Sequence, residues 1–105
     1  MNLPLSGVRV ADFTRVLTGP YCTQTLGDLG ADVLKIEPPS GDDTRQWGPP
    51  FGADGQATYF QSCNRNKKSV ALDLKNPSDL EIAKRVIAKS DVLVENFRPG
   101  TLEKL

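Results

Sequence analysis

Residues 91–100, DVLVENFRPG, indicate the fold class most directly. The apolar run Val92–Val94 is followed at once by polar and turn-forming residues. A short strand that is apolar on both faces is typical of the interior of a parallel sheet covered by helices. Ligands of such sheets bind beyond the carboxyl ends of the strands. The amide of Asn96, the ring of Phe97 and the positive charge of Arg98 are therefore predicted to lie at a binding edge.

The rest of the chain alternates predicted strands with predicted helices. A strand, a helix and a second strand within about thirty residues form a βαβ unit, and its right-handed crossover makes the two strands parallel. The sequence therefore predicts an α/β fold with the layout of a nucleotide-binding half-fold. Strands are predicted at residues 8–13, 32–37, 69–74 and 91–97, and helices from residue 20 to about residue 29, from residue 77 and from residue 99.

Local signals predict the faces and ends of the helices. Cys22, Leu26 and Leu29 recur at i, i+4 and i+7 and predict the buried stripe of the first helix. Gly30 is predicted to end this helix, because a residue in the left-handed conformation commonly follows a helix C-terminus. Asn76 is the predicted N-cap of the second helix, with proline at the next position.

Residues 40–61 interrupt the alternation with many glycines and prolines. Loops of this length in compact domains are usually functional or mobile. The aromatic residues in this loop, Trp47 among them, predict an ordered loop, because such side chains need a surface to pack on. The basic run at residues 65–68 is expected to be a solvated turn.

Composition argues against several classes of function. The 105 residues fit one domain at most, and 13 Lys and Arg balance 13 Asp and Glu, so no basic excess supports nucleic-acid binding. No apolar run is long enough to span a membrane, and the first residues lack the apolar core of a signal peptide. The two cysteines lack metal or redox spacing, and histidine is absent. We therefore expect a cytoplasmic protein without a metal site.

The predicted strand ends bring together an apolar slot flanked by cations. The turn after the first strand lacks the G-x-G-x-x-G fingerprint, so a pyrophosphate clamp of the NAD type is disfavoured. An adenine ring between apolar walls, with its phosphates held by Lys or Arg, fits such a slot. The residues at the four strand ends are 15–18, 37–39, 72–75 and 96–98.

Each candidate in the slot also has a simpler structural role, which the sequence leaves open. These simpler roles are core packing for Val16, Leu17 and Phe97, a solvated position for Lys75 and Arg98, and a backbone hydrogen bond at a strand end for Asn96.

Sequence motifs follow one another along nearly the whole chain. They are PLSGVRVADFTRVLTGPYCT at residues 4–23, LGDLGADVLKIEPP at 26–39, GDDTRQWGPPF at 41–51, YFQSCNRNKKSVALDLK at 59–75 and DVLVENFRPG at 91–100. In this order they resemble the class III CoA-transferases, the family of formyl-CoA transferase, carnitine CoA-transferase and α-methylacyl-CoA racemase.

The resemblance implies a Rossmann-like sheet and a longer protein, in which residues 1–105 are the N-terminal part of the large domain. A stop one turn into a helix, with Leu102 and Leu105 in need of cover, agrees with this expectation. Family members form interlocked homodimers and move CoA between an acyl-CoA and a small carboxylic acid, with no cofactor beyond these substrates. Their nucleophile is an aspartate that lies beyond residue 105. The resemblance therefore assigns no catalytic residue here, and it predicts that this stretch alone is inactive.

The resemblance also implies that the strand ends bind CoA. Pro38 stands where some transferases carry a basic residue that meets the 3′-phosphate, so that phosphate would either be held by Arg45, Lys75 or Lys104 or be bound less tightly. Leu17 stands where some members have glutamine, which leaves only its backbone N–H to donate a hydrogen bond near the reacting end. The residues implied to bind CoA are Val16, Leu17, Thr18, Leu72, Lys75, Asn96, Phe97, Arg98 and Lys104.

The loop at residues 41–64 separates the branches of the family. It is longer than is typical of the racemase branch and resembles the dicarboxylate-using transferases, so it favours a transferase with a succinyl-CoA donor. An α-methylacyl-CoA racemase-like enzyme is the alternative within the family. A non-catalytic nucleotide-binding module is the alternative of another class, and exposed sheet edges in so short a chain speak against it.

Overall fold

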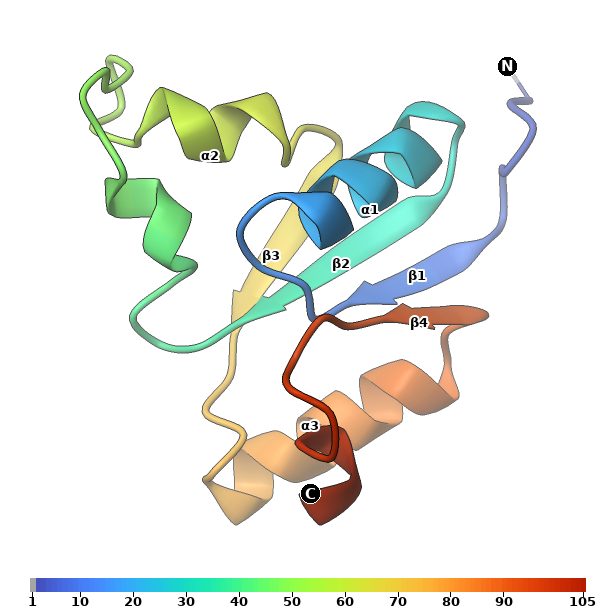
Figure 1. Ribbon diagram of the computed structural model, residues 1–105. Coiled ribbons are helices and arrows are strands. Elements are labelled where there is room, and N and C mark those ends of the chain that lie inside the picture. The colour runs from blue at the N-terminus through green and yellow to red at the C-terminus, as the bar shows by residue number, and fades with distance from the viewer. Residues whose placement is uncertain (1) are drawn as a thin grey trace.

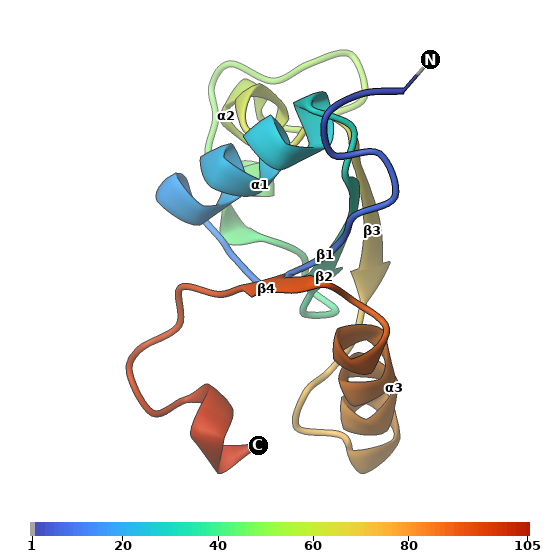
Figure 2. The ribbon, with the colours of Figure 1, turned by 90° about the vertical axis from the view of Figure 1, so that its right-hand side faces the viewer.

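The computed structural model describes residues 2–105, and it shows one parallel sheet with helices on both faces (Figure 1). Figure 2 shows α1 and α2 on one face of the sheet and α3 on the other. The strands are β1 (Arg9–Asp12), β2 (Asp32–Glu37), β3 (Lys67–Ala71) and β4 (Val92–Val94), and the helices are α1 (Thr18–Asp28), α2 (Thr58–Ser62), α3 (Pro77–Ala88) and the 3-10 helices η1 (Asp43–Gln46) and η2 (Leu102–Lys104). The predicted α/β fold is confirmed.

The strand order β3-β2-β1-β4 places β1 beside both β2 and β4, and every pairing is parallel. The chain therefore crosses from β1 to β2 on one side and returns from β3 to β4 on the other. The connections that leave β1 and β4 diverge at the carboxyl edge, which makes this edge a topological switch point.

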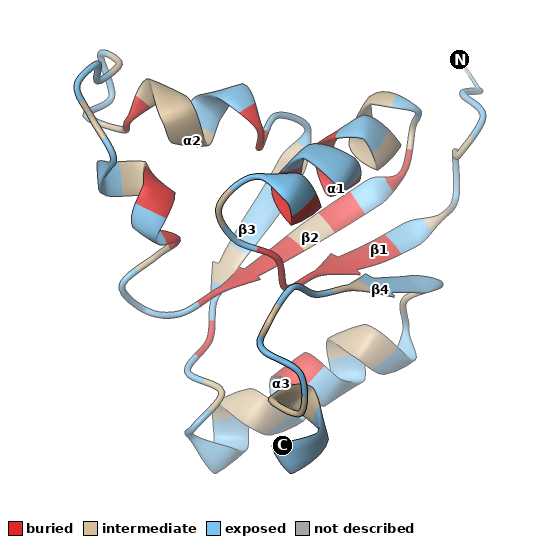
Figure 3. Ribbon diagram, in the orientation of Figure 1, coloured by how far each residue is buried: buried red, intermediate tan, exposed pale blue. Residues whose placement is uncertain are grey.

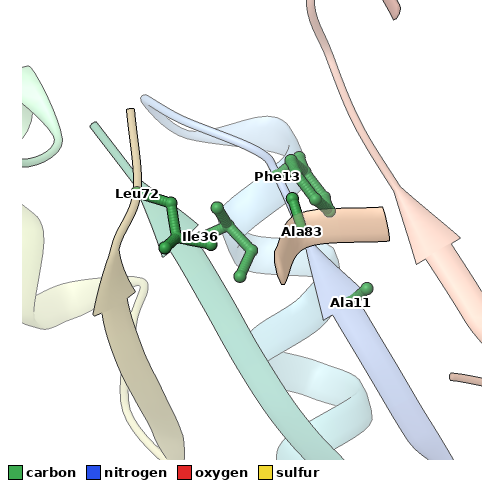
Figure 4. Close-up of a cluster of buried hydrophobic side chains, with 5 residues drawn as sticks. All are labelled: Ala11, Phe13, Ile36, Leu72 and Ala83. Carbon is green, nitrogen blue, oxygen red and sulfur yellow. The ribbon is translucent and has the colours of Figure 1, made fainter. Parts of the chain in front are cut away.

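Two apolar clusters fill the two faces of the sheet, because successive side chains of a strand point to opposite sides. Ala11 and Ile36 join a buried cluster that includes Ala83 of α3 (Figure 4). Val10 and Val33 join a second cluster, against which Leu26 of α1 packs. Figure 3 shows that the buried residues concentrate on β1 and β2.

The predicted buried stripe of α1 is wrong. Cys22 is exposed and Leu29 is 42% exposed, while Leu26 is only half-buried. The buried residues of the helix are instead Gly19, Pro20, Thr23 and Gln24. The first turn of α1 passes so close to the turn after β1 that a Cβ added at Gly19 would lie 2.4 Å from a side-chain carbon of Thr14, so small and polar residues occupy this face.

The helix-end predictions are confirmed. Gly30 follows α1 with φ +107°, a left-handed conformation that glycine adopts without strain. Asn76 caps α3, because its Oδ1 accepts hydrogen bonds from the backbone N–H groups of Ser78 and Asp79.

Strand positions differ from the sequence prediction at several ends. β3 begins at Lys67 rather than residue 69, because Lys67 pairs with Val33 of β2. β1 and β4 are shorter than predicted, since the residues that follow them leave the sheet and form loops at its carboxyl edge. β4 is also an edge strand of this sheet and not an interior one, with Leu93 40% exposed.

The long loop is ordered, as its aromatic residues predicted. Within residues 40–61 lie η1 and most of α2, and the Trp47 and Tyr59 rings meet edge to face with centroids 5.5 Å apart. The Arg45 guanidinium lies 3.9 Å from the centroid of the Phe60 ring. Among residues 2–105, no helix combines the length and the apolarity that crossing a membrane requires.

Candidate functional site

A cavity of about 230 Å³ opens at the carboxyl edge of the sheet. It lies where α/β sheets bind their ligands, beyond the strand ends and at the switch point. Its walls come from residues 13–15 after β1, residues 36–38 at the end of β2, residues 41–43 in the loop that follows, residues 72–75 after β3, and Phe97 after β4. The prediction that these strand ends meet is confirmed.

The apolar part of the cavity continues the core of the sheet. Phe13, Ile36 and Leu72 are buried in the cluster on the α3 face and also line the cavity (Figure 4). The half-buried ring of Phe97 packs against the same cluster. Because the core fixes these side chains, the apolar wall is formed before any ligand arrives.

Two cations flank the apolar wall. The Arg15 guanidinium lies 5.6 Å from the centroid of the Phe97 ring, within the range of a cation–π contact. Lys75 is exposed at the opposite loop, where its backbone N–H donates a hydrogen bond to Asp73 Oδ1. An apolar slot with a cation on either side suits a ligand that joins an aromatic ring to phosphate groups.

The Glu37 carboxylate lines the cavity but is fully occupied. It accepts hydrogen bonds from Arg45 Nε (2.8 Å), Arg45 Nη2 (2.7 Å), the backbone N–H of Asp42 (2.7 Å) and the Ser69 hydroxyl. Burial alone raises the pKa of Glu37, but the bonds from Arg45, Ser69 and Asp42 outweigh it and lower the pKa to about 2. Glu37 is therefore ionised at neutral pH and does not act there as a general acid.

Asp42 and Lys35 tie the long loop to the sheet. Lys35 Nζ lies 3.0 Å from Asp42 Oδ2, and both side chains are about 1% exposed. Burial works to raise the pKa of Asp42, whereas its bonds from the backbone and hydroxyl of Thr44 and the nearby Lys35 lower it, with a net lowering. The ion pair holds residues 41–43 over the cavity.

The turn after β1 is also tied down. The backbone N–H of Thr14 donates to Asp12 Oδ1 at 2.9 Å, and Lys35 Nζ donates to the Thr14 carbonyl at 2.8 Å. Asn96 holds the next residue, since it accepts from the Arg15 N–H at 3.1 Å and donates to the Arg15 carbonyl at 2.8 Å. Val16 then adopts φ +75°, which is unfavourable for a β-branched residue.

The prediction of a solvated turn at residues 65–68 is wrong for Lys67. Its side chain is 2% exposed, and Nζ lies 3.0 Å from Asp12 Oδ2 while it donates to Asn64 Oδ1 and the Pro20 carbonyl. Burial lowers the pKa of Lys67, and the neighbouring Asp12 offsets this only in part. The lysine is buried because β3 begins at this residue and directs its side chain under α1.

Only some of the residues predicted to bind CoA line the cavity. Leu72, Lys75 and Phe97 line the cavity, whereas Asn96 bonds the backbone at the strand end, the simpler role that the sequence left open. Val16, Leu17, Thr18, Arg98 and Lys104 do not line the cavity of this chain. No ligand contact tests these roles, so they stay predictions.

Several lining residues were missed by the sequence reasoning. Residues 41–43 reach the cavity because of the Lys35–Asp42 and Glu37–Arg45 pairs, and no local pattern marks such contacts. Of the cations considered for the 3′-phosphate, Arg45 is held on Glu37 and by Gln56 Oε1, which leaves Lys75 as the one that lines the cavity.

A Rossmann-like parallel sheet with an apolar, cation-flanked cavity at its switch point defines an α/β protein of the kind that binds its ligands beyond the strand ends. The model of the family described as CoA-transferase family III matches residues 5–105. The chain belongs to this family.

Individual relatives agree with the family. The chain is 55% identical to the succinyl-CoA:glutarate CoA-transferase of Mus musculus, over 97% of this chain and 23% of that protein. It is 49% identical to the succinate–glutarate CoA-transferase of Agrobacterium fabrum, over 96% of this chain and 27% of that protein. The crystal structure of a CAIB/BAIF family protein from Brucella suis matches with a TM-score of 0.95 and 48% identity, over 99% of this chain and 28% of that one. The chain thus spans about a quarter of the length of these relatives.

Proposed function

We propose that this chain forms part of the CoA-binding wall of a CoA-transferase that moves CoA between an acyl-CoA, such as succinyl-CoA, and a dicarboxylic acid. The observation that carries the proposal is the apolar, cation-flanked cavity at the carboxyl edge of a chain that belongs to CoA-transferase family III. The similarity to transferases named for succinyl-CoA and glutarate supports the substrate class.

The cavity suggests how the nucleotide end of CoA is held. In this proposal the adenine ring packs against Leu72 and Phe97 and the phosphates meet Arg15 and Lys75, since all four residues line the cavity. Two carboxylates near the cavity already form ion pairs, Asp12 with Lys67 and Glu37 with Arg45. By the family resemblance, the attacking carboxylate belongs to a part of the protein beyond residue 105, and this chain supplies binding groups.

The proposal extends to the assembly and its setting. Acyl-CoA and a small carboxylic acid are the substrates, no further cofactor takes part, and the protein works in the cytoplasm as an interlocked homodimer. The family resemblance supports the homodimer, and the absence of histidine and of paired cysteine motifs fits the cytoplasmic setting.

The first prediction concerns CoA itself. Calorimetry on the longest protein that carries this chain should detect CoA binding. Dephospho-CoA should bind several-fold more weakly, because it lacks the 3′-phosphate that Lys75 is proposed to bind. Equal affinities for both ligands would mean that the 3′-phosphate is not recognised. A folded protein that binds neither ligand would contradict the proposed function.

The second prediction concerns Lys75. Lys75→Ala should weaken CoA binding about tenfold, equivalent to about 1.4 kcal/mol, and should change the chemical step less. The preference for CoA over dephospho-CoA should shrink in the same variant. Lys68→Ala removes an exposed lysine of β3 outside the cavity and serves as the control. Unchanged affinity in Lys75→Ala would make Lys75 a turn residue only.

A further inference from the structure

The Asn96 side chain joins two segments that lie 81 positions apart in the sequence. Its Oδ1 accepts the Arg15 N–H at 3.1 Å and its Nδ2 donates to the Arg15 carbonyl at 2.8 Å. One carboxamide thus satisfies both backbone groups of one residue, in the manner of a strand partner. The loop after β4 and the turn after β1 are held together by this clamp.

The clamp lies beside two groups of the cavity wall. Arg15 is the clamped residue, and Phe97, whose ring lies under its guanidinium, follows Asn96 directly. Arg15 and Phe97 line the cavity, whereas Asn96 does not. The Asn96 carboxamide therefore affects the cavity wall indirectly, because it fixes the backbone of Arg15.

The next residue shows why a clamp is needed. Val16 has φ +75°, a conformation that a β-branched residue adopts only when its surroundings impose it. Thr14 on one side is fixed by Asp12 and Lys35, and the Val16 carbonyl accepts a long contact of 3.6 Å from Cys63 Sγ. Without Asn96, the backbone between these ties is able to relax toward a conformation that valine prefers.

We propose that Asn96 is a positioning residue, which holds the strained turn at residues 15–16 and thereby sets the Arg15 guanidinium against Phe97 as one wall of the ligand cavity. The identity of the ligand as CoA rests on the proposed function, whereas the action of Asn96 on the turn does not. A residue that works in this way matters to binding without contacting the ligand.

The first test measures the turn without any ligand. In Asn96→Ala, the amide of Arg15 should exchange its hydrogen about tenfold faster or more, because its acceptor is lost. Amides of β2 should keep their wild-type rates. Gln61→Ala, which removes an exposed carboxamide of α2, is the matched control and should leave the turn unchanged. Unaltered exchange at Arg15 in Asn96→Ala would overturn the proposal.

The second test measures CoA affinity in two backgrounds. Asn96→Ala should weaken CoA binding about tenfold, since two hydrogen bonds that fix the wall are lost. Glycine adopts positive φ without strain, so in a Val16→Gly background the same substitution should cost about threefold or less relative to Val16→Gly alone. A direct contact between Asn96 and the ligand predicts an equal loss in both backgrounds, and that result would contradict the positioning role.

The two tests separate the inference from the proposed function. If the wild-type protein binds no CoA while Asn96→Ala still speeds exchange at Arg15, the positioning role stands and the CoA assignment fails. If CoA binds and Asn96→Ala changes neither the exchange nor the affinity, the CoA assignment stands and the positioning role is refuted.

Discussion

Asp12→Ala is expected to lower the free energy of unfolding by about 3–5 kcal/mol, the cost of removing one partner from a buried ion pair. Asp12 is fully buried, and its carboxylate accepts bonds from Thr14 and Thr23 while it neutralises Lys67. The substitution leaves an ammonium group 2% exposed with only neutral partners. Urea unfolding, followed by circular dichroism, measures the loss.

Two further variants separate the ion pair from the hydrogen bonds. Lys67→Met should cost less than Asp12→Ala, because the Asp12 carboxylate keeps its bonds to Thr14 and Thr23. In Asp12→Ala/Lys67→Met both charges are gone, and the loss should be smaller than the sum of the two single losses. Additive losses would mean that the two charges do not stabilise one another in the folded state.

The elements that local sequence determines were predicted well. β2 runs over Asp32–Glu37 as predicted, and Asn76 caps α3 as predicted, because strand patterning and capping depend on residues close together in the chain. The buried face of α1 could not be predicted from residues close together in the chain. Gly19 and Thr23 face inward because this part of the helix packs on Thr14 and Asp12 at the end of β1, and that surface exists only after the sheet has formed.

The same division applies to the site. The rule that ligands bind beyond parallel strands placed Leu72, Lys75 and Phe97 at one cavity from sequence alone. Lys67 was misjudged because β3 starts two residues earlier than predicted, which makes Lys67 a strand residue paired with Val33 and not part of a turn. Asn96 makes the backbone hydrogen bonds that were its simpler role in the sequence reasoning, because the loop after β4 lies beside the turn after β1, and its contact with the ligand stays a prediction.

Glu37→Gln is expected to destabilise the protein by about 3 kcal/mol at neutral pH, and the loss should disappear in acid. The pKa of Glu37 is lowered from 4.5 to about 2 in the folded protein, so its ionised form stabilises the fold fully above the unfolded pKa, near 4.5. This contribution is lost as the pH falls through about 2, where the folded carboxyl group takes up its proton. Unfolding free energies of wild type and variant, measured from neutral pH down to about pH 2, should therefore converge.

Whether the two unfolding free energies converge in acid tests whether Glu37 stabilises the fold through its charge or through its packing. Glutamine has nearly the same size but accepts only weakly from both Arg45 and Ser69, so a loss that is constant with pH would point to packing and would contradict the ionised pair. Glu81→Gln, the same substitution on the exposed surface of α3, should change stability by less than about 0.5 kcal/mol throughout. The Glu37 carboxylate is ionised at neutral pH and bonded on both oxygens, so it holds the loop at residues 41–43 in place and does not exchange a proton there.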